Sequence, residues 1–151
     1  MNSTFLFLLF GVLILLQCST SCSTDKQAPG RELPPCPGSP NCVSSQEPTG
    51  ARHVEPFTYQ GTQAEARARL IAVLHAIPRA KIVTADENFL HVEFRSAVFG
   101  FVDDVDILFD DGNKVIQVRS ASQVGYYDFG VNRRRVEELR KRFMAAGQSN
   151  G

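Results

Sequence analysis

The sequence predicts an α+β domain in which a curved antiparallel sheet carries two helices on one face. Apolar residues recur at helical spacing in two segments, and between these segments apolar and polar residues alternate with a period of two. Strands joined by short turns pair antiparallel, and an amphipathic helix buries its apolar stripe against the apolar face of such a sheet. The expected order of elements is β-α-β-β-β-β-α.

The N-terminal segment, residues 1–22, is predicted to be a signal peptide. It has no charged side chain, and its apolar run from Phe5 to Leu16 is too short to span a bilayer comfortably. A run of this length suits the central region of a secretory signal. We therefore expect export to the periplasm or another compartment outside the cytoplasm.

Cys22 is the expected lipid attachment site, because the small residues 19–21 precede it as in a lipoprotein signal. No Lys or Arg occupies the first positions, and Ser19 stands where such signals usually have leucine. Ordinary cleavage and an uncleaved anchor are therefore the alternatives to lipidation at Cys22.

Residues 23–50 are predicted to form a tether, because proline and glycine there interrupt helices and interior strands. The tether contains Cys36 and Cys42. In an oxidising compartment so close a pair favours a disulfide bond over a metal or redox pair, since the segment has neither a second pair of ligands nor a C-x-x-C motif. Closing this short loop outside the core should contribute only about 2 kcal/mol.

A single domain is expected over residues 51–147, followed by a tail over residues 148–151. Residues 54–60 are an edge-strand candidate, because Pro56 excludes an interior position in a sheet. Thr62 and Glu65 have the spacing of a capping box, and the helix that they start continues to Ile77, before Pro78.

A four-stranded meander follows between residues 81 and 119. Turns are expected at 86–88, at Gly100 and at the DDGN sequence of residues 110–113. A second helix begins near Asn132, which is placed to cap it, and ends at Gly147. This order is closest to the helix-grip or TATA-binding-protein-like group of folds.

The charge balance argues against binding to nucleic acid. The chain has 16 basic and 16 acidic residues, all of them after residue 22, so the exported part is neutral. A nucleic-acid-binding domain depends on an excess of Lys and Arg for its phosphate contacts. Nothing in the sequence indicates a cofactor.

Charged residues gather on the sheet face opposite the helices, where cross-strand neighbours come together. They form either a solvated face of ion pairs or the floor of a shallow ligand site walled by residues 120–132. In the second case one arginine, Arg119 or Arg133, would bind a small anion together with the N–H groups of the helix start. The candidate ligand-binding residues are Arg95, Asp104, Asp106, Arg119, Ser120, Ser122, Asp128, Asn132 and Arg133.

Catalytic and metal-ligating residues are not indicated. His53, His75 and His91 are scattered, so a catalytic histidine is not expected, and neither G-x-S-x-G nor S-x-x-K marks a nucleophile. The paired aspartates between 103 and 106 have no third ligand at informative spacing.

Three consecutive arginines, residues 133–135, open the second helix, where positive charge is unfavourable unless a negative group lies nearby. Successive helical positions point about 100° apart. We expect one arginine to pair with Asp128 or Asp103, one to be solvated near the glutamates at 137 and 138, and one to face an anion. The aromatic residues of the preceding loop, Tyr126, Tyr127 and Phe129, are expected to pack back over the edge of the core, with the lining of a ligand site as the alternative.

Three stretches closely resemble the family known as domain of unknown function 1499. They are CPGSPNCVSS at 36–45, FRSAVFGFVDDVDILFD at 94–110 and VRSASQVGYYDFGVNRRRVEELR at 118–140, and the resemblance extends over residues 33–145. Gln123 stands where the family commonly has arginine, and Tyr127 where it commonly has a small residue. The resemblance implies an exported or lipid-anchored bacterial protein and assigns no activity.

Three functions follow as hypotheses. The first is an exported, membrane-tethered accessory or small-ligand-binding domain without catalysis, whose partners are the membrane and a small anionic ligand. The second is an envelope enzyme acting on an anionic small molecule through residues Asp104, Asp106, Arg119, Ser120 and Asp128. The third is a structural envelope lipoprotein. A deep pocket at the polar residues would favour the enzyme, and a flat ion-paired face would favour the other two.

Overall fold

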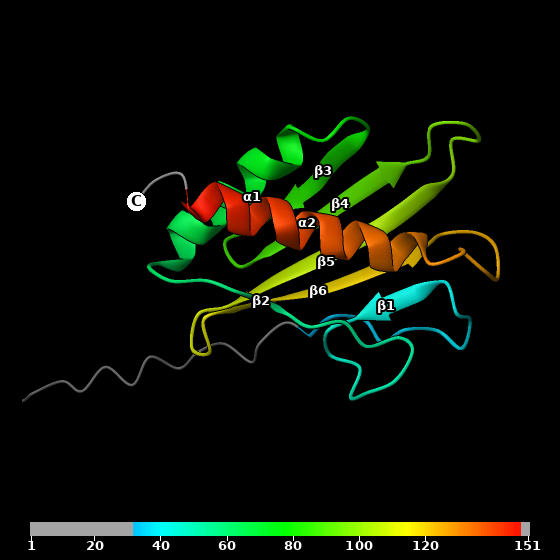
Figure 1. Ribbon diagram of the computed structural model, residues 1–151, viewed down its shortest axis with the longest axis horizontal. Coiled ribbons are helices and arrows are strands. Elements are labelled where there is room, and N and C mark those ends of the chain that lie inside the picture. Colours follow the sequence, from blue (N-terminus) through cyan, green and yellow to red (C-terminus); the bar gives the residue numbers. More distant parts are fainter. Residues whose placement is uncertain (1–31, 149–151) are drawn as a thin grey trace, which may run out of the picture. The chain divides into compact units, whose positions relative to one another are not determined.

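The computed structural model describes residues 32–148, which form an α+β domain (Figure 1). The elements in chain order are β1 (Cys42–Ser44), β2 (Phe57–Thr58), α1 (Gln63–His75), β3 (Ala80–Ala85), β4 (Phe89–Arg95), β5 (Val102–Asp110), β6 (Val115–Ser122) and α2 (Val131–Gln148). The predicted α+β class is confirmed. The predicted signal peptide with Cys22, the tether up to residue 31 and the end of the tail lie outside the described residues.

All strands belong to one antiparallel sheet with the order β1-β6-β5-β4-β3, and β2 also pairs with β6. The predicted meander is therefore present as β3 to β6. The predicted order of elements was incomplete, because β1 precedes β2 and had not been expected. The likeness to the helix-grip or TATA-binding-protein-like group stays a prediction.

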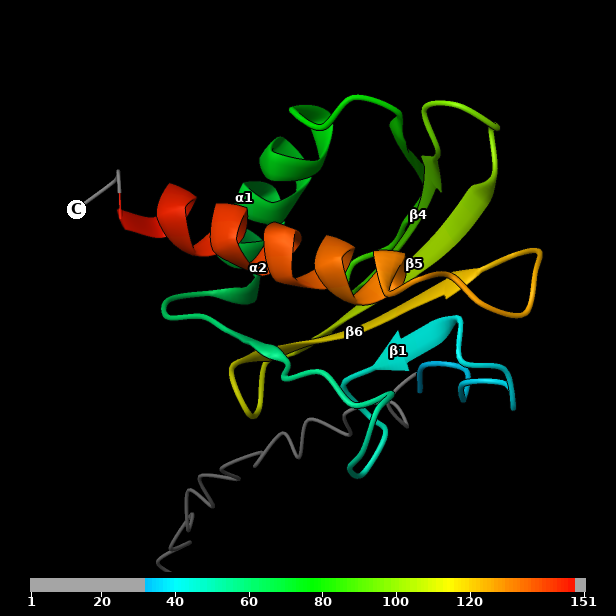
Figure 2. The same cartoon turned by 45° about the vertical axis from the view of Figure 1, so that its right-hand side comes forward.

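Both helices lie on the same face of the sheet (Figure 2). Residues of α1 and α2 share one hydrophobic cluster with the strand residues that point toward them, among them Val105, Ile107 and Phe109 of β5. Because side chains alternate along a strand, the residues between these point to the open face. Asp104 and Asp106 are thereby placed opposite the helices.

Helix α1 begins as its sequence predicts. The Thr62 side chain accepts a hydrogen bond from the Glu65 N–H, and the Glu65 carboxylate accepts one from the Thr62 N–H, which completes a capping box. Buried residues of α1 face the sheet; they are Ala66, Leu70, Val73 and Leu74. Neither helix of residues 32–148 is long and apolar enough to cross a membrane.

Residues 32–50 are part of the domain, so the predicted tether is wrong for this stretch and the boundary at residue 51 is too late. Cys42 pairs with Ala121 and Ser44 with Arg119 along the edge of β6. Leu33 packs against Phe89 and Leu108 on the open face. A three-residue edge strand gives no periodic signal, and the prolines around it occupy irregular backbone that an edge position tolerates.

Candidate functional site

The sheet divides the predicted ligand-binding residues between its two faces. Arg119 and Ser120 are neighbours in β6 and therefore point in opposite directions. Arg119 faces Asp106 on the open face, whereas Ser120 contacts Asn132 of α2. The expectation that these residues form one polar cluster is therefore wrong, as is the proposed five-residue enzyme site.

The open-face cluster consists of His91, Asp104, Asp106 and Arg119. One Asp106 oxygen lies 2.8 Å from His91 Nδ1, and the other accepts a hydrogen bond of 3.1 Å from Arg119 Nη1. Asp104 Oδ1 lies 3.6 Å from His91 Nε2 and accepts a hydrogen bond of 3.0 Å from Gln123. Both carboxylates are thus engaged by neighbouring side chains.

His91 is the member that sequence reasoning missed. It pairs with Asp106 across β4 and β5, and Asp106 pairs with Arg119 across β5 and β6, so one row of the sheet aligns all three. Applying the register set by the two turns to the sequence would have revealed this row. An imidazole beside a carboxylate is an arrangement that general bases use. The histidine side chain is 26% exposed.

Other observations restrict what the open-face cluster can do. Arg119 Nε is buried and finds no acceptor within residues 32–148. Arg95 lies at the margin, with Nη2 3.8 Å from Glu93 Oε2. Among the described residues no group of three or more His, Cys, Asp and Glu side chains could hold a metal ion.

The helix-side cluster consists of Asp103, Ser120, Asn132 and Arg135. The Ser120 hydroxyl donates to Asn132 Oδ1 over 2.6 Å and accepts a hydrogen bond of 3.1 Å from Arg135 Nη1. The other terminal nitrogen of Arg135 donates to Asp103. Because Ser120 is fully buried and committed to these partners, it is unsuited to act as a nucleophile.

Asn132 ties the start of α2 to three parts of the chain. Its Nδ2 donates to the Asn41 carbonyl at 2.9 Å, to Ser122 Oγ at 3.0 Å and to Asp128 Oδ2 at 2.9 Å. Asp128 also accepts the N–H groups of Gly130 and Asn132. The side chain that caps α2 is therefore Asp128, and the prediction that Asn132 caps the helix is wrong.

The pKa of Asp128 is lowered from its ordinary value, although burial acts in the opposite direction. Removing the carboxylate from water raises its pKa, but the N–H groups of Asn132 and Gly130 and the Asn132 side chain stabilise the charged form more. The helix start thus contains a carboxylate that is held in its ionised state.

The three arginines of α2 use separate partners, as their angular spacing requires. Arg135 pairs with Asp103, which was one of the two expected acids. Arg133 donates to the carbonyls of Ala51 and His53, and Arg134 donates to the carbonyl of Phe129. The prediction that one arginine faces an anion gains no support from Arg133, because its Nη2 donates to both of these carbonyls.

Two hollows of the described surface are relevant to the clusters. One of about 550 Å³ is lined by Tyr59, Arg69, Lys114 and Met144 among others. Another of about 330 Å³ is lined by Leu33, Pro48 and Ser44, and Ser44 is the cross-strand neighbour of Arg119. Neither hollow is lined by a member of the open-face or helix-side cluster, and the open-face side chains are paired with one another.

Comparison with known families adds one decisive observation. Residues 32–143 match the model of a protein family of unknown function, DUF1499. The chain belongs to the DUF1499 family. No curated protein matches the sequence. The match begins at residue 32, so it includes β1 and the cysteine pair, as the structure does.

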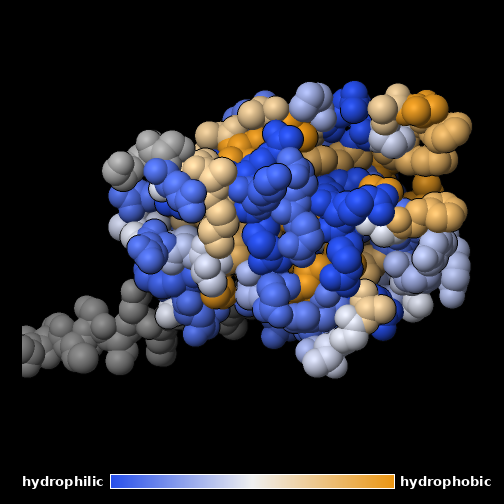
Figure 3. Space-filling view, viewed as in Figure 1, coloured by the Kyte–Doolittle hydropathy of each residue, from blue (hydrophilic) through white to orange (hydrophobic). Residues whose placement is uncertain are grey.

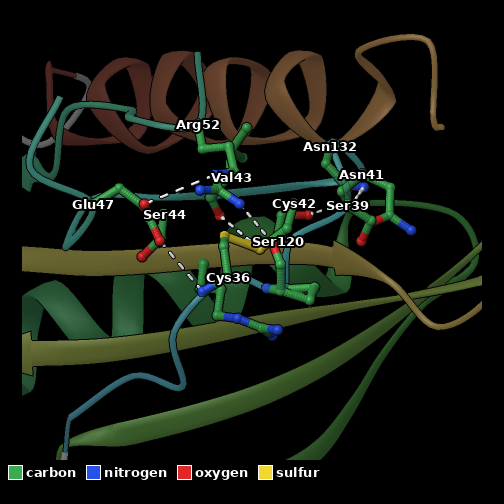
Figure 4. The surroundings of a disulfide bond; sticks show 12 residues. Cys36, Ser39, Asn41, Cys42, Val43, Ser44, Glu47, Arg52, Ser120 and Asn132 are labelled. Carbon is green, nitrogen blue, oxygen red and sulfur yellow. Dashed lines mark hydrogen bonds and ion pairs between the residues drawn. A yellow bond between two sulfur atoms is a disulfide. The ribbon is translucent and has the colours of Figure 1, made fainter. Parts of the chain in front are cut away.

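The DUF1499 domain contains the predicted disulfide bond, between Cys36 and Cys42 (Figure 4). The bond closes a loop whose last residue, Asn41, accepts hydrogen bonds from Ser122 N–H and from the Asn132 side chain. Cys42 is fully buried. The expectation that this loop lies outside the folded domain is wrong.

Exposed apolar side chains are concentrated in two loops of the DUF1499 domain. Eight of the ten large apolar side chains that are exposed among the described residues belong to the β4–β5 loop or to the connection from β6 into α2. We call them the apolar loop surface; they are Val98, Phe99, Phe101, Val124, Tyr126, Tyr127, Phe129 and Val131, and their exposed fractions run from 38% to 81%.

The two loops leave the sheet side by side. The Gln123 N–H donates to the Val102 carbonyl over 3.1 Å, which joins the end of β6 to the start of β5. Apolar surface gathers at the right-hand end of Figure 3, where these loops lie in Figure 1. Within each loop two aromatic rings touch: Phe99 with Phe101, and Tyr127 with Phe129. The prediction that the second pair packs back over the core is wrong.

Proposed function

We propose that this DUF1499 protein is an exported, membrane-tethered recognition domain without catalytic activity, and that it binds its partner through the apolar loop surface. The observation that carries the proposal is the contrast between the polar and the apolar residues. Most of the polar side chains expected to bind a ligand are hydrogen-bonded to other groups of the domain, whereas eight large apolar side chains of adjacent loops are exposed among the described residues. Surfaces of this kind on a soluble domain mark interaction sites.

Catalysis is the second candidate, and only the His91–Asp106 pair favours it. His91 is partly accessible from solvent, and the buried Asp106 would hold the imidazole in one orientation. An enzyme also needs a group for the base to activate and a concave place for the substrate. The hollows described above do not adjoin His91, and Ser120 lies on the other face of the sheet.

Membrane tethering rests on the sequence before residue 32. Mass spectrometry of the protein from membrane fractions should find Cys22 as the N-terminal residue and carrying diacylglycerol, with residues 1–21 removed. Protein recovered entirely in the soluble fraction with an unmodified Cys22 would contradict the tether.

Site-directed photo-crosslinking in intact cells tests recognition by the loops. A photoreactive phenylalanine analogue replaces Phe99 or Phe129, and the matched controls replace Val83 on the outer strand β3 or Glu93 on the open face. We expect adducts, with protein or with lipid, from the loop positions and background from both controls. Adducts from the Glu93 position alone would contradict the proposal in favour of an open-face ligand site. Background at all four positions would favour a purely structural lipoprotein.

A further inference from the structure

We propose that the partner of the apolar loop surface is the interfacial region of an anionic lipid bilayer. This inference rests on the proposed function and names the partner of the same surface. In it the two loop tips insert their aromatic and aliphatic side chains among the lipid headgroups, while the sheet and helices stay in water.

The composition of the tips suits an interface between water and hydrocarbon. Two phenylalanines, Phe99 and Phe101, occupy the first loop, and two tyrosines followed by Phe129 occupy the second. Tyrosine places its ring in the apolar boundary and its hydroxyl toward water, which is why it is enriched at membrane interfaces. Both loops extend past the ends of their strands, so they can enter a flat surface together (Figures 1 and 2).

Neither loop carries a free carboxylate that would oppose its insertion into an anionic bilayer. Residues 96–101 contain no charged side chain, and the single acid of residues 123–130 is Asp128. Its two oxygens accept hydrogen bonds from Gly130, from Asn132 N–H and from the Asn132 side chain. The negative charge of Asp128 is therefore directed inward to the start of α2.

Positive charge borders the loops. Arg95 stands at the base of the first loop with its side chain 58% exposed, and Arg134 lies exposed in the first turn of α2. That turn contains no acidic residue and has the positive end of the helix dipole. Exposed arginines beside an apolar tip complement anionic headgroups.

The chain between the predicted lipid attachment site, Cys22, and the domain is long enough for the lipid and the loop tips to reach the same bilayer. Leu33 lies against Phe89 and Leu108, toward the end of the sheet away from the loops. A strand of nine residues such as β5 spans about 30 Å, and the ten residues 23–32 reach at most roughly 35 Å when extended. Because this reach exceeds the length of the strand, a lipid on Cys22 and the loop tips can meet the same membrane when the loops enter it end-on.

The absence of tryptophan from the chain allows a direct test. A single tryptophan replaces Phe99 or Tyr127 in the full chain, and Val83→Trp on β3 is the matched control, since Val83 is also exposed. Each protein is added to vesicles of phosphatidylcholine, with or without phosphatidylglycerol, that contain brominated lipid. The quenching reports each tryptophan's own depth, whatever the N-terminal segment does.

We expect the emission of both loop tryptophans to shift to the blue and to be quenched, most strongly with phosphatidylglycerol, while Val83→Trp stays unshifted. Adding Arg95→Gln and Arg134→Gln should reduce the quenching of the loop tryptophan to its level in neutral vesicles. Loop tryptophans that behave like the Val83→Trp control would overturn the bilayer proposal. If crosslinking still yields protein adducts at Phe99, recognition by the loops survives with a protein partner; if crosslinking also gives background, both proposals fail.

Discussion

Arg135 illustrates how a single side chain can join a sheet to a helix. Its guanidinium bridges Asp103 of β5, Ser120 of β6 and Asn132 of its own helix. The side chains of the Arg135–Asp103 pair are 13% and 9% exposed, so water screens their attraction little. In contrast, Arg142 and Glu138 on the same helix form a pair whose members are about half exposed.

Arg135→Gln should destabilise the domain by about 3 kcal/mol, because it leaves the carboxylate of Asp103 buried without its cation. Arg142→Gln is the matched control and should change the free energy of unfolding by less than about 1 kcal/mol. Urea unfolding of both variants measures the difference. Equal losses in the two variants would show that the buried pair has no special structural role.

Asp128 should make the stability of the domain depend on pH in the acidic range. Because its pKa is lowered in the folded state, its contribution is complete above the ordinary value of 3.8 and is lost as the pH falls through the folded-state pKa. Asp128→Asn should therefore be less stable than the wild type near neutral pH, by roughly 0.3–1 kcal/mol, because the start of α2 loses its negative charge.

Urea unfolding of the wild type and Asp128→Asn from neutral pH to below the folded-state pKa checks this dependence. The difference in unfolding free energy between the two proteins should shrink toward acid, because Asp128 loses its charge there. The other carboxylates titrate in both proteins, so their contributions cancel. A difference that stays constant over this range would rule out an ionised Asp128 as the source of the stabilisation.

Individual residues also show where sequence reasoning reached its limit. The charged face with Asp104, Asp106 and Arg119 could be predicted, because alternation alone assigns these residues to one side of the strands. The same alternation assigns Arg119 and Ser120 to opposite faces, but the predicted site placed them together. The partners of Arg133 could not be predicted, because they are backbone carbonyls that lie far from it in sequence.

At the level of elements, the N-terminal strand β1 depends on a covalent bond and on hydrogen bonds more than on its own length. It has three residues; it pairs with β6, and its Ser44 also forms an isolated bridge with His53. The Cys36–Cys42 disulfide is attached to its first residue, Cys42, and the residue before the strand, Asn41, contacts Asn132 of α2. The disulfide therefore positions the strand and the start of the helix together.

Replacing both Cys36 and Cys42 with serine should lower the free energy of unfolding by at least the roughly 2 kcal/mol of loop closure. An additional loss is expected because serine would place a hydroxyl at the buried position of Cys42. Hydrogen exchange should show faster opening of residues 42–44 and of the first turn of α2. Unchanged exchange in both segments would mean that the disulfide is dispensable for their order.

Strong local signals predicted most elements, and β1 had none. The capping box at Thr62 and Glu65 marks the start of α1, and the alternation after residue 81 marks the meander. In β1 the surrounding prolines and glycines indicated a loop. Its pairing with the edge of β6 is a tertiary contact, which propensity does not encode.

At the scale of the whole domain, polar and apolar residues outside the core have different roles. The open-face and helix-side clusters link strands to one another and to α2, while the apolar loop surface stands free at one end of the sheet. We infer from these contacts that Arg119 and Arg133, which the sequence predicts to bind an anion, have structural roles instead.

Thermal unfolding of the wild type, Arg119→Ala and Arg133→Ala, each with and without phosphate, sulfate and acetate, tests this claim most directly. Arg119→Ala should be less stable by about 1–3 kcal/mol, because Asp106 loses the partner of one oxygen. If Arg119 and Arg133 have structural roles, each anion should change the Tm of the three proteins equally. A rise in Tm that occurs in the wild type and is missing from either variant would contradict it and place an anion site at these arginines.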